Sequence, residues 1–257
     1  MVEISNTSML FLLIFVLIPV SLSYLYSLQL GRSIIWSSFR GVIQLFLIGY
    51  VLTFLFDLPP LQGIPLMLGV MIMVATFHAG KKGQGLPYIR SVIFTIIVAV
   101  EAMVLTMWLS FEMISFTPEQ VIPMSGMIIG NSMIAIGLAL ERMGHQFKES
   151  YDKIISALSL GAHPKQATQP IVQKVVKAAM IPNIDGLKTV GLVQLPGMMT
   201  GLILGGVPPL EAIRYQIVIS LSIFVCVSVS AMLVSVIIYR FFFNKHMQLI
   251  RLGHEEG

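Results

Sequence analysis

The stretch IISALSLGAHPKQATQPIVQKVVKAAMIP, residues 154–182, is the longest part of the chain that a bilayer could not hold. It carries three lysines and lies between two blocks of strongly apolar sequence. Gly161 can take the left-handed conformation that closes a helix, and Pro164 suits the first turn of the next helix. The pattern therefore predicts a short helix–turn–helix that lies against one surface of the membrane.

Apolar residues recur at helical spacing on both sides of this turn, and lysines occupy the opposite face of the second helix. A connecting loop that rests on lipid head groups would show this pattern. So would a segment that binds a soluble protein. The apolar positions are Ile154, Ile155 and Leu158 before the turn, and Ile171, Val175, Val176 and Ala179 after it.

The spacing around the turn resembles the EAA loop of ABC importer permeases, which reads Glu-Ala-Ala, three residues, Gly, nine residues, Ile. Ala157, Gly161 and Ile171 occupy the matching positions, and Ile155 stands where the family has Glu. In that family the loop helix docks into a cleft of the cytosolic ATPase. The ATPase-coupling residues predicted on this basis are Ala157, Gly161, Ala162, Pro164 and Ile171.

Composition places the whole chain in the membrane. Of 257 residues, 56% are hydrophobic and 11% are charged, and the mean hydropathy is +0.88, whereas soluble domains carry about a quarter charged residues. The net charge of +4 lies in the joints between apolar blocks, which favours membrane topology over nucleic-acid binding. The single cysteine, Cys226, excludes a disulfide framework and a cysteine metal site.

We expect an all-α, polytopic membrane protein with about seven transmembrane helices, since a span needs roughly 20 apolar residues. Residues 1–257 form one permease domain in this interpretation, with a cytosolic coupling segment at about 142–184. The first span lacks the basic start of a signal peptide, so we expect it to remain in the mature protein. The predicted spans are 8–28, 37–56, 61–79, 88–110, 119–141, 185–206 and 211–240.

The arginines and lysines predict the orientation. With the N-terminus outside, fifteen of the sixteen basic residues fall in inner joints and only Arg214 falls outside. This asymmetry assigns the large loop and the C-terminus to the cytoplasm. The inner basic residues are Arg32 and Arg40, then Lys81, Lys82 and Arg90, then those of residues 142–188, and last Arg240, Lys245 and Arg251.

Enzymatic motifs are absent from the sequence. A rhomboid-type protease needs Gly-x-Ser-Gly, but the run 123–126 reads Pro-Met-Ser-Gly. No histidine lies in the interior of a predicted span, and His78 is at the end of one. The glycine-rich run 80–85 lacks the Lys-Ser/Thr of a P-loop. We therefore expect no enzyme and no cofactor in this chain, and any ATP-Mg must be bound by another polypeptide.

Polar residues inside the spans are the candidates for a substrate pathway. Glu101 stands near the centre of the fourth span, where an acidic residue costs about 2.5–3.5 kcal/mol on insertion scales, and it is the candidate metal ligand. Alternatively, Glu101 is neutral or paired with Arg40 or Asn131 and holds helices together, and the methionines are packing material. The predicted pathway residues are Glu101, Asn131, Gln44, Gln194 and Met127.

Glycines spaced four apart follow a proline in both spans that flank the coupling segment. Such a stripe lets another helix approach closely, and a proline loosens the helix one turn earlier. We expect the two spans to pack together and to transmit movement of the coupling segment. The predicted packing and hinge residues are Pro123, Gly126 and Gly130 in the fifth span, and Pro196, Gly197, Gly201 and Gly205 in the sixth.

Longer motifs resemble the Fet-type permease family, which includes the bacterial iron-export permease and plant aluminium-tolerance membrane subunits. The resemblance covers nearly the whole chain and implies a permease subunit of an ABC transporter. Bacterial relatives are linked to iron efflux, and plant relatives to aluminium tolerance and nucleotide-sugar movement. The motifs are RGVIQLFLIGYVL (40–52), VIPMSGMIIGNSMIAIGLAL (121–140), LSLGAHPKQA (158–167), IPNIDGLKTVGLVQLPGMMTGLILGG (181–206) and PPLEAIRYQIVI (208–219).

We therefore expect two copies of the chain in the cell membrane, each docked on a separate cytosolic ATPase subunit, to export iron or a related metal ion. ATP binding would close the ATPases and convert an inward-open cavity to an outward-open one. Other interpretations remain open: a different ABC cargo such as a nucleotide sugar, an ion-coupled secondary transporter that uses Glu101 as a proton carrier, or an intramembrane enzyme.

Overall fold

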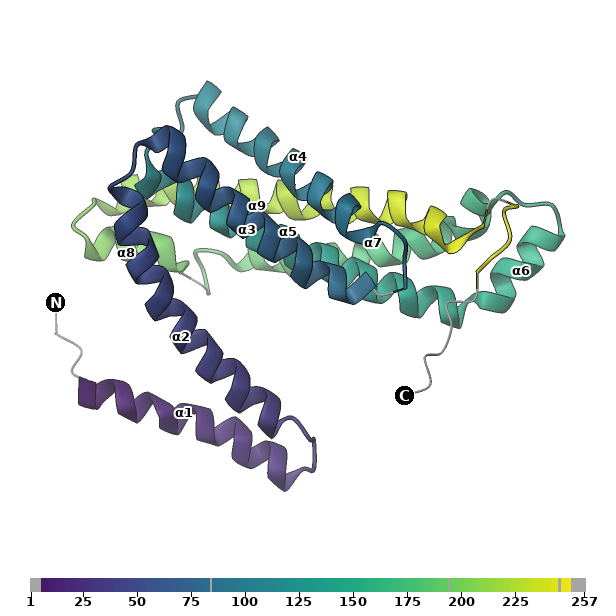
Figure 1. Ribbon diagram of the computed structural model, residues 1–257, viewed down its shortest axis with the longest axis horizontal. Coiled ribbons are helices and arrows are strands. Elements are labelled where there is room, and N and C mark those ends of the chain that lie inside the picture. Colours follow the sequence, from purple (N-terminus) through teal and green to yellow (C-terminus); the bar gives the residue numbers. More distant parts are fainter. Residues whose placement is uncertain (1–5, 84, 194, 245, 251–257) are drawn as a thin grey trace. The chain divides into compact units, whose positions relative to one another are not determined.

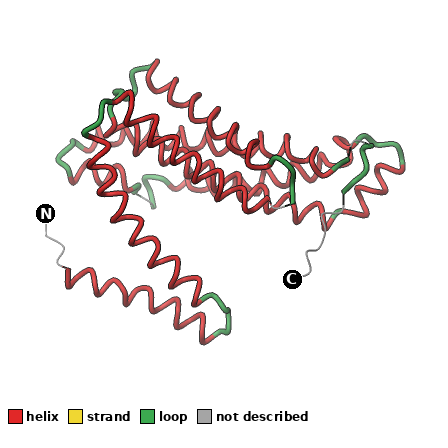
Figure 2. Tube along the Cα trace, viewed as in Figure 1, coloured by secondary structure: helices red, strands yellow, loops and turns green. Residues whose placement is uncertain are grey.

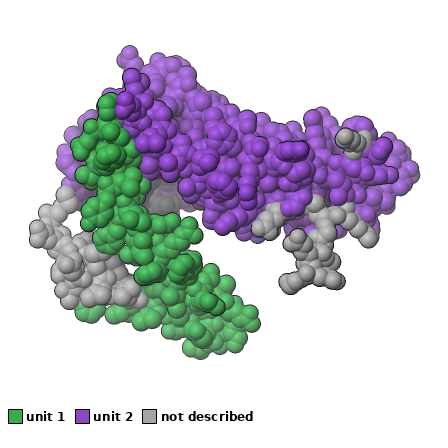
Figure 3. Space-filling model, viewed as in Figure 1, with its two compact units in different colours: residues 1–59 green, residues 60–257 purple. Residues whose placement is uncertain are grey.

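The computed structural model describes residues 6–83, 85–193, 195–244 and 246–250, and every named element in these ranges is a helix (Figure 2). The chain divides into two compact units, residues 1–59 and residues 60–257 (Figure 3). The prediction of an all-α membrane protein is confirmed. The single-domain interpretation stays a prediction.

Unit 1 is a helical hairpin of α1 (Asn6–Leu25) and α2 (Gly31–Phe56). The hydroxyl of Ser23 accepts a hydrogen bond from the Leu30 N–H at 3.0 Å, which ties the turn to the end of α1. A Cβ added at Gly31 would lie 3.2 Å from the Tyr24 ring. The close approach of the two helices at the turn therefore depends on a glycine at this position.

Unit 2 is a bundle in which α5 packs against α3, α4, α7 and α9 (Figure 1). Trp108, Ile136 and Ile219 are fully buried in this core. The elements are α3 (Pro60–Gly80), the 3₁₀ helix η1 (Lys81–Gly83), α4 (Ile89–Ser110), α5 (Pro118–Glu149), α6 (Tyr151–Ser159), α7 (Pro164–Thr189), α8 (Gly197–Leu204), α9 (Pro209–Ile238) and the 3₁₀ helix η2 (Tyr239–Phe242).

Prolines set the starts of the long helices α3, α5, α7 and α9. Each of these helices has proline as its first residue, where the missing N–H would have had no partner in the helix. Glu119 and Glu211 follow in the first turns of α5 and α9, where a negative charge interacts favourably with the helix dipole. The starts of these helices can therefore be predicted from the residues at the helix ends themselves.

Among the described residues, five helical segments are long and apolar enough to cross a membrane: Gly31–Phe56, Pro60–Gly83, Ile89–Ser110, Pro118–Glu149 and Pro209–Phe242. They correspond to the second, third, fourth, fifth and seventh predicted spans. The first predicted span is α1, which has a shorter apolar segment at Ile14–Leu25. The chain is therefore a multi-pass membrane protein with fewer such helices than the sequence predicted.

The sixth predicted span, 185–206, is wrong as a continuous helix. Helix α7 continues to Thr189, and α8 has only 8 residues, which is about 12 Å of helix and too short to cross a bilayer. Gly191 has φ of +83°, and Pro196 disfavours helical geometry at the residue before it. These two residues interrupt a stretch whose average hydropathy resembles that of a span.

Basic residues between the predicted spans lie at one end of unit 2. Lys82 Nζ lies 2.8 Å from a carboxylate oxygen of Glu141, which links η1 to α5. At the same end, the rings of Phe147 and Phe242 stack with their centroids 4.0 Å apart. Within unit 2, the joint of Lys81 and Lys82 thus lies at the same end as the end of α5 and the segment after α9. Arg32 and Arg40 belong to unit 1, and Lys245 and Arg251 lie outside the described residues.

Candidate functional site

The predicted turn between residues 154 and 165 has the expected local geometry. Gly161 has φ of +88°, its N–H donates to the Leu158 carbonyl, and the Ala162 N–H donates to the Ala157 carbonyl, each at 3.0 Å. This pair of hydrogen bonds is the Schellman motif that ends a helix. Pro164 begins α7. We call residues 154–165 the α6–α7 tip.

The start of α7 is closed by a capping box. The backbone N–H of Lys165 donates to the His163 ring, and the His163 N–H donates to the Gln166 side chain at 3.0 Å. Both hydrogen bonds satisfy N–H groups that have no partner inside the helix. The tip is therefore a rigid corner at the end of the bundle that is opposite α8 (Figure 1).

Helix α7 is not a short element on the membrane surface, which corrects the sequence interpretation. Its apolar stripe, including Ile171, Val175 and Ala179, is buried, and the helix packs along α5 and α9. Ile171 therefore has a packing position, and its side chain is not free to contact another protein. By contrast, Leu160 at the tip is 90% exposed.

Glu101 lies in the core of the bundle, where its side chain is 3% exposed. The Ser125 hydroxyl of α5 lies beside its carboxyl group, and the Cys226 thiol of α9 is close enough to interact with its charge. Neither carboxyl oxygen has a hydrogen-bond partner among the described residues. Three helices thus enclose an acidic group whose hydrogen bonds are unmade.

Further hydroxyl groups in the core also lack hydrogen-bond partners among the described residues. Ser125 and Ser132 are seven residues apart and so lie on the same face of α5. Single serines carry little signal in an apolar sequence, and only the packing of several helices reveals their grouping. The buried hydroxyl oxygens without a partner belong to Thr76, Ser125, Ser132, Ser230 and Ser235.

The structure does not bring Asn131 to Glu101. The Asn131 side-chain amide donates to the Met127 carbonyl of its own helix at 2.8 Å, and the residue is half-buried. Because successive residues turn by about 100° in a helix, Asn131 is roughly 120° around α5 from Ser125. The alternative in which Asn131 pairs with Glu101 is therefore not the arrangement found.

Met127 lines a separate pocket of about 420 Å³ between the starts of α5, α8 and α9. Pro123 and Gly201 line the same pocket, which brings together residues from two predicted spans. The acidic residues of the pocket are Glu119 and Glu211.

The glycine stripe does not pack against another helix of this chain. A Cβ added at Gly197 or Gly201 would meet no atom within 4 Å. Pro196 is the N-cap of α8 and Gly205 its C-cap, so both residues mark helix ends rather than a bend in a span. The predicted close packing of the fifth and sixth spans through these glycines is wrong within one chain.

The two glycines of α5 differ from each other. A Cβ at Gly126 would lie 3.5 Å from the Met71 side chain of α3, whereas a Cβ at Gly130 would meet nothing within 4 Å. Gly126 therefore faces α3 rather than α8. Pro123 lies within α5, which continues without interruption from Pro118 to Glu149.

The remaining predicted pathway residues are Gln44 and Gln194. Gln44 is exposed on α2 of unit 1, in a shallow groove formed with neighbouring α2 residues. Gln194 lies outside the described residues. Their assignment to a substrate pathway stays a prediction.

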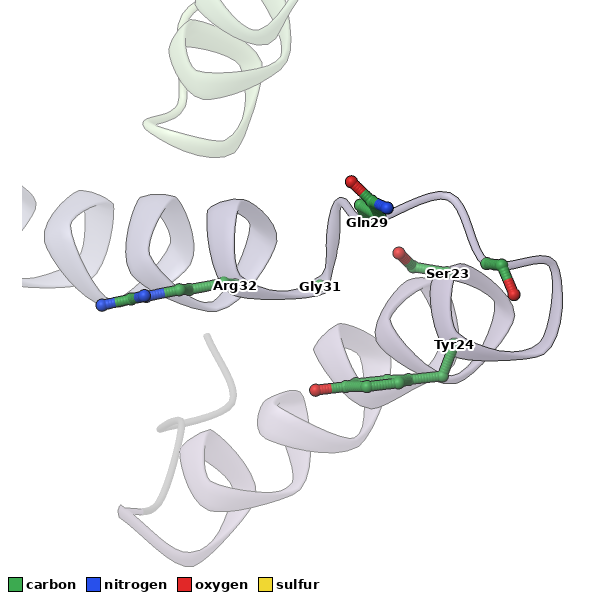
Figure 4. Close-up of a pocket in the computed structure, with 6 residues that line it drawn as sticks. Ser23, Tyr24, Gln29, Gly31 and Arg32 are labelled. Atoms are coloured by element: carbon green, nitrogen blue, oxygen red, sulfur yellow. The ribbon is translucent and has the colours of Figure 1, made fainter. Parts of the chain in front are cut away.

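Unit 1 also has a pocket of about 390 Å³ at the turn between α1 and α2. Figure 4 shows the Tyr24 ring and the Arg32 side chain reaching away from the turn on the same side. Ser27 and Gln29 in this turn have φ of 53° and 57°, a region that non-glycine residues rarely adopt. The turn between α1 and α2 thus combines unfavourable backbone conformations with polar side chains.

The described side chains do not form a site for a permanently bound metal ion. Among the described residues, no group of three or more histidine, cysteine, aspartate or glutamate side chains could hold a metal ion. Glu101 has the Ser125 hydroxyl and the Cys226 thiol near it instead. The arrangement can hold a proton, or a cation for a short time, but it lacks the ligand number of a permanent site.

Comparison with known proteins decides the family. The profile described as an uncharacterised protein family, UPF0014, matches residues 6–243. The chain belongs to the UPF0014 family. This membership confirms the resemblance to the Fet-type permeases that the sequence motifs indicated.

Curated relatives of this UPF0014 chain match over most of their length. The probable iron export permease protein FetB of Escherichia coli (strain K12) is 36% identical over 96% of both chains. YjkA, a UPF0014 membrane protein of Bacillus subtilis (strain 168), is 37% identical over 92% of this chain and 95% of its own. ALUMINUM SENSITIVE 3 of Arabidopsis thaliana is 35% identical over 92% and 87%. No solved structure is significantly similar to the chain.

Proposed function

We propose that the chain is the permease subunit of an ABC transporter that exports iron or a related metal ion. The similarity to a protein named a probable iron export permease, over 96% of both chains, is the observation that supports this proposal. The chain carries no nucleotide-binding motif of its own. A separate ATPase subunit therefore binds and hydrolyses ATP-Mg.

The α6–α7 tip is the surface that binds the ATPase subunit. It combines an exposed apolar side chain, Leu160, with the exposed Lys165, and the exposed Lys153 directly precedes the tip. The Schellman motif and the capping box hold the tip in one conformation, so binding orders little additional chain. In this proposal the end with the basic joints faces the cytoplasm, as the excess of arginine and lysine indicates, and the N-terminus lies outside.

Two copies of the chain form the membrane pathway, each with its own ATPase subunit. Glu101 is the acidic group of that pathway, and it is sealed when the bundle is packed as described. ATP binding moves the tip. Helix α7 transmits this movement to α5 and α9 because it packs along both helices. Separation of the core helices then exposes the carboxyl group to the cargo.

Transport by purified protein tests this function. We expect vesicles that contain the permease and its ATPase to move labelled Fe²⁺ in an ATP-dependent way, with Mn²⁺ and a nucleotide sugar as competing cargoes. Leu160→Glu should abolish both co-purification of the ATPase and stimulation of its activity. Met247→Glu, an exposed methionine of the C-terminal tail, serves as the matched control and should change neither. Unimpaired co-purification with Leu160→Glu would remove the tip from the interface.

An ion-coupled secondary transporter is the second candidate, and the unpartnered buried carboxyl of Glu101 favours it. A proton carrier needs one acidic group that alternates between two sides of the membrane, and it needs no metal ligand set. Vesicles that contain the permease alone separate the two candidates. Cargo movement driven by a proton gradient without ATPase would favour the secondary transporter, and its absence would favour the ABC exporter.

A further inference from the structure

The chain between α7 and α8 is irregular, and this break is a distinct feature of unit 2. Residues 190–196 belong to no helix in the part of the chain that the structure describes. Helix α7 starts at the α6–α7 tip, and α8 lies at the opposite end of the bundle (Figure 1). Met198 and Gly201 of α8 line a pocket together with Met127 of α5. The break therefore lies between the two ends of the bundle.

With the basic end of the bundle taken as the cytoplasmic surface, as in the proposed function, helix lengths place the end of α7 at the depth of the membrane. A rise of about 1.5 Å per residue puts Asp185 roughly 32 Å from Pro164 along α7. Glu141 marks the basic end of the bundle through its ion pair with Lys82. From that level to the end of α5 is about 12 Å, and α6 adds about 13 Å at most. Asp185 thus lies on the order of 7–20 Å inside the apolar part of the bundle.

An ion pair occupies this depth. Lys188 Nζ lies 3.0 Å from a carboxylate oxygen of Asp185, and the side chains are 68% and 61% exposed, respectively. Two residues before Asp185, on a different face of α7, the side-chain nitrogen of Asn183 is buried without a hydrogen-bond partner among the described residues. Leu192 and Val193 of the break are also exposed. A charged pair and an exposed, non-helical segment therefore follow each other closely along the chain.

Lipid cannot cover such a place. Irregular backbone inside the hydrocarbon region occurs only where protein covers it or where it lines a water-filled cavity. Ionisable side chains within membrane segments likewise face a cavity or a partner, and they mark ion or substrate paths. Interrupted helices near the membrane midplane form substrate sites in many transporters. The exposed face of Asp185 and Lys188 is therefore a water-accessible surface.

We propose that Asp185 is a cation-binding residue of the transport path and that Lys188 is its internal counter-ion, which the cargo cation displaces. The inference rests on the proposed function, because it assigns a residue to the cargo of that transporter. The Asp185 carboxylate offers oxygen ligands that suit a divalent cation. In the empty state Lys188 neutralises the carboxylate from the same helix turn, so no net charge is left inside the membrane.

This arrangement predicts opposite effects for the two partners. Asp185→Asn removes the ligand but keeps the shape of the side chain, and we expect the apparent affinity for Mn²⁺ or Fe²⁺ to fall at least tenfold. Lys188→Met removes the competitor. Because exposed ion pairs contribute about 0.2–1 kcal/mol, affinity should rise roughly 1.4- to 5-fold. Lys177→Met changes an exposed lysine elsewhere on α7 and should leave affinity unchanged.

Equilibrium binding of Mn²⁺, followed by electron paramagnetic resonance on the full-length permease in lipid nanodiscs, is the decisive measurement. Asp185→Glu serves as the conservative variant that should keep binding, and thermal unfolding of each variant excludes a folding defect. Wild-type affinity in Asp185→Asn, or no Mn²⁺ or Fe²⁺ binding by the wild type, would overturn the assignment. Loss of cargo binding in Lys188→Met with Asp185→Asn unaffected would overturn it in favour of an anionic cargo.

Vesicle transport separates this inference from the proposed function. If the wild type exports Fe²⁺ with its ATPase and Asp185→Asn does so equally well, only the assignment of Asp185 fails. If the wild type exports neither Fe²⁺ nor Mn²⁺ but moves a nucleotide sugar, the proposed cargo itself fails. Export by the wild type with loss in Asp185→Asn, together with the binding data, supports both.

Discussion

The core formed by α3, α4, α5 and α9 and the excursion formed by α6, α7 and α8 treat their polar groups in opposite ways. In the core, Glu101 is enclosed and has no hydrogen-bond partner among the described residues. In the excursion, Asp185 has a partner in Lys188 and is open to its surroundings. The difference indicates that Glu101 is kept at a cost to stability, whereas Asp185 has a partner that, in our proposal, a cation displaces.

The largest effect should come from Glu101. Glu101→Leu removes a buried polar group without a partner, which costs about 1–3 kcal/mol in the folded state, so thermal stability should hold or rise. Transport should be lost in this variant and in Glu101→Gln, while binding of the ATPase stays normal. Vesicle export and thermal unfolding measure the two effects, with Glu112→Gln in an exposed joint as the control.

A fall in thermal stability with Glu101→Leu would mean that the buried carboxyl group stabilises the core instead of weakening it. The carboxyl group would then hold helices together, as one interpretation of the sequence proposed. Normal export with Glu101→Gln would lead to the same conclusion. In either case Asp185 would remain as the acidic candidate for the pathway.

The second effect tests whether buried side chains anchor α6, at the tip of the excursion, to the bundle. Ile154 of α6 is 1% exposed, whereas the adjacent Ile155 is 36% exposed. Ile154→Ala should cost about 2–5 kcal/mol because it leaves a cavity, and Ile155→Ala should have a much smaller effect. Urea unfolding in detergent measures both. Equal effects of the two substitutions would mean that the tip is not anchored to the bundle.

The third effect concerns the turn itself. Gly161→Val should cost about 1–2 kcal/mol, because a left-handed conformation is unfavourable for residues with a Cβ. Gly161→Asn should cost less, since asparagine tolerates this conformation. No atom lies within 4 Å of an added Cβ, so backbone strain is the main cost. ATPase stimulation should follow the same order, and an unchanged coupling ratio with Gly161→Val would argue against a mechanical role.

The smallest effect should come from the ion pair between Lys82 and Glu141. Both side chains are more than half exposed, and exposed pairs contribute little and are screened by salt. Lys82→Gln should lower the melting temperature slightly at low ionic strength and leave it unchanged at high ionic strength. A drop as large as that of Ile154→Ala would show that this pair, and not packing, closes the basic end of the bundle.

Sequence analysis succeeded where the determinants are local. Gly161 and Pro164 define the turn by their own backbone preferences, and the apolar composition defines most of the spans. It failed at residues 185–206, because an average over a window does not register how Gly191 and Pro196 interrupt the helix. The prediction consequently began a span at Asp185, where α7 instead continues to Thr189.

The surroundings of Glu101 could not be predicted for a different reason. Its position near the centre of a span was visible in the sequence, and its burial follows from the packing of α4. The approach of Ser125 and Cys226, however, depends on the rotation of α5 and α9 about their axes. Asn131 illustrates the same limit, since it lies close to Ser125 in the sequence but faces another direction.

The stacked rings of Phe147 and Phe242, with centroids 4.0 Å apart, tie the end of α5 to the segment that follows α9. In the proposed function, a movement of the basic end therefore acts on α5 and α9 together. The opposite end has no comparable aromatic clasp among the described side chains, and it contains the pocket between α5, α8 and α9. The two ends of the bundle thus differ in construction, since stacked aromatic rings join one end and a pocket lies at the other.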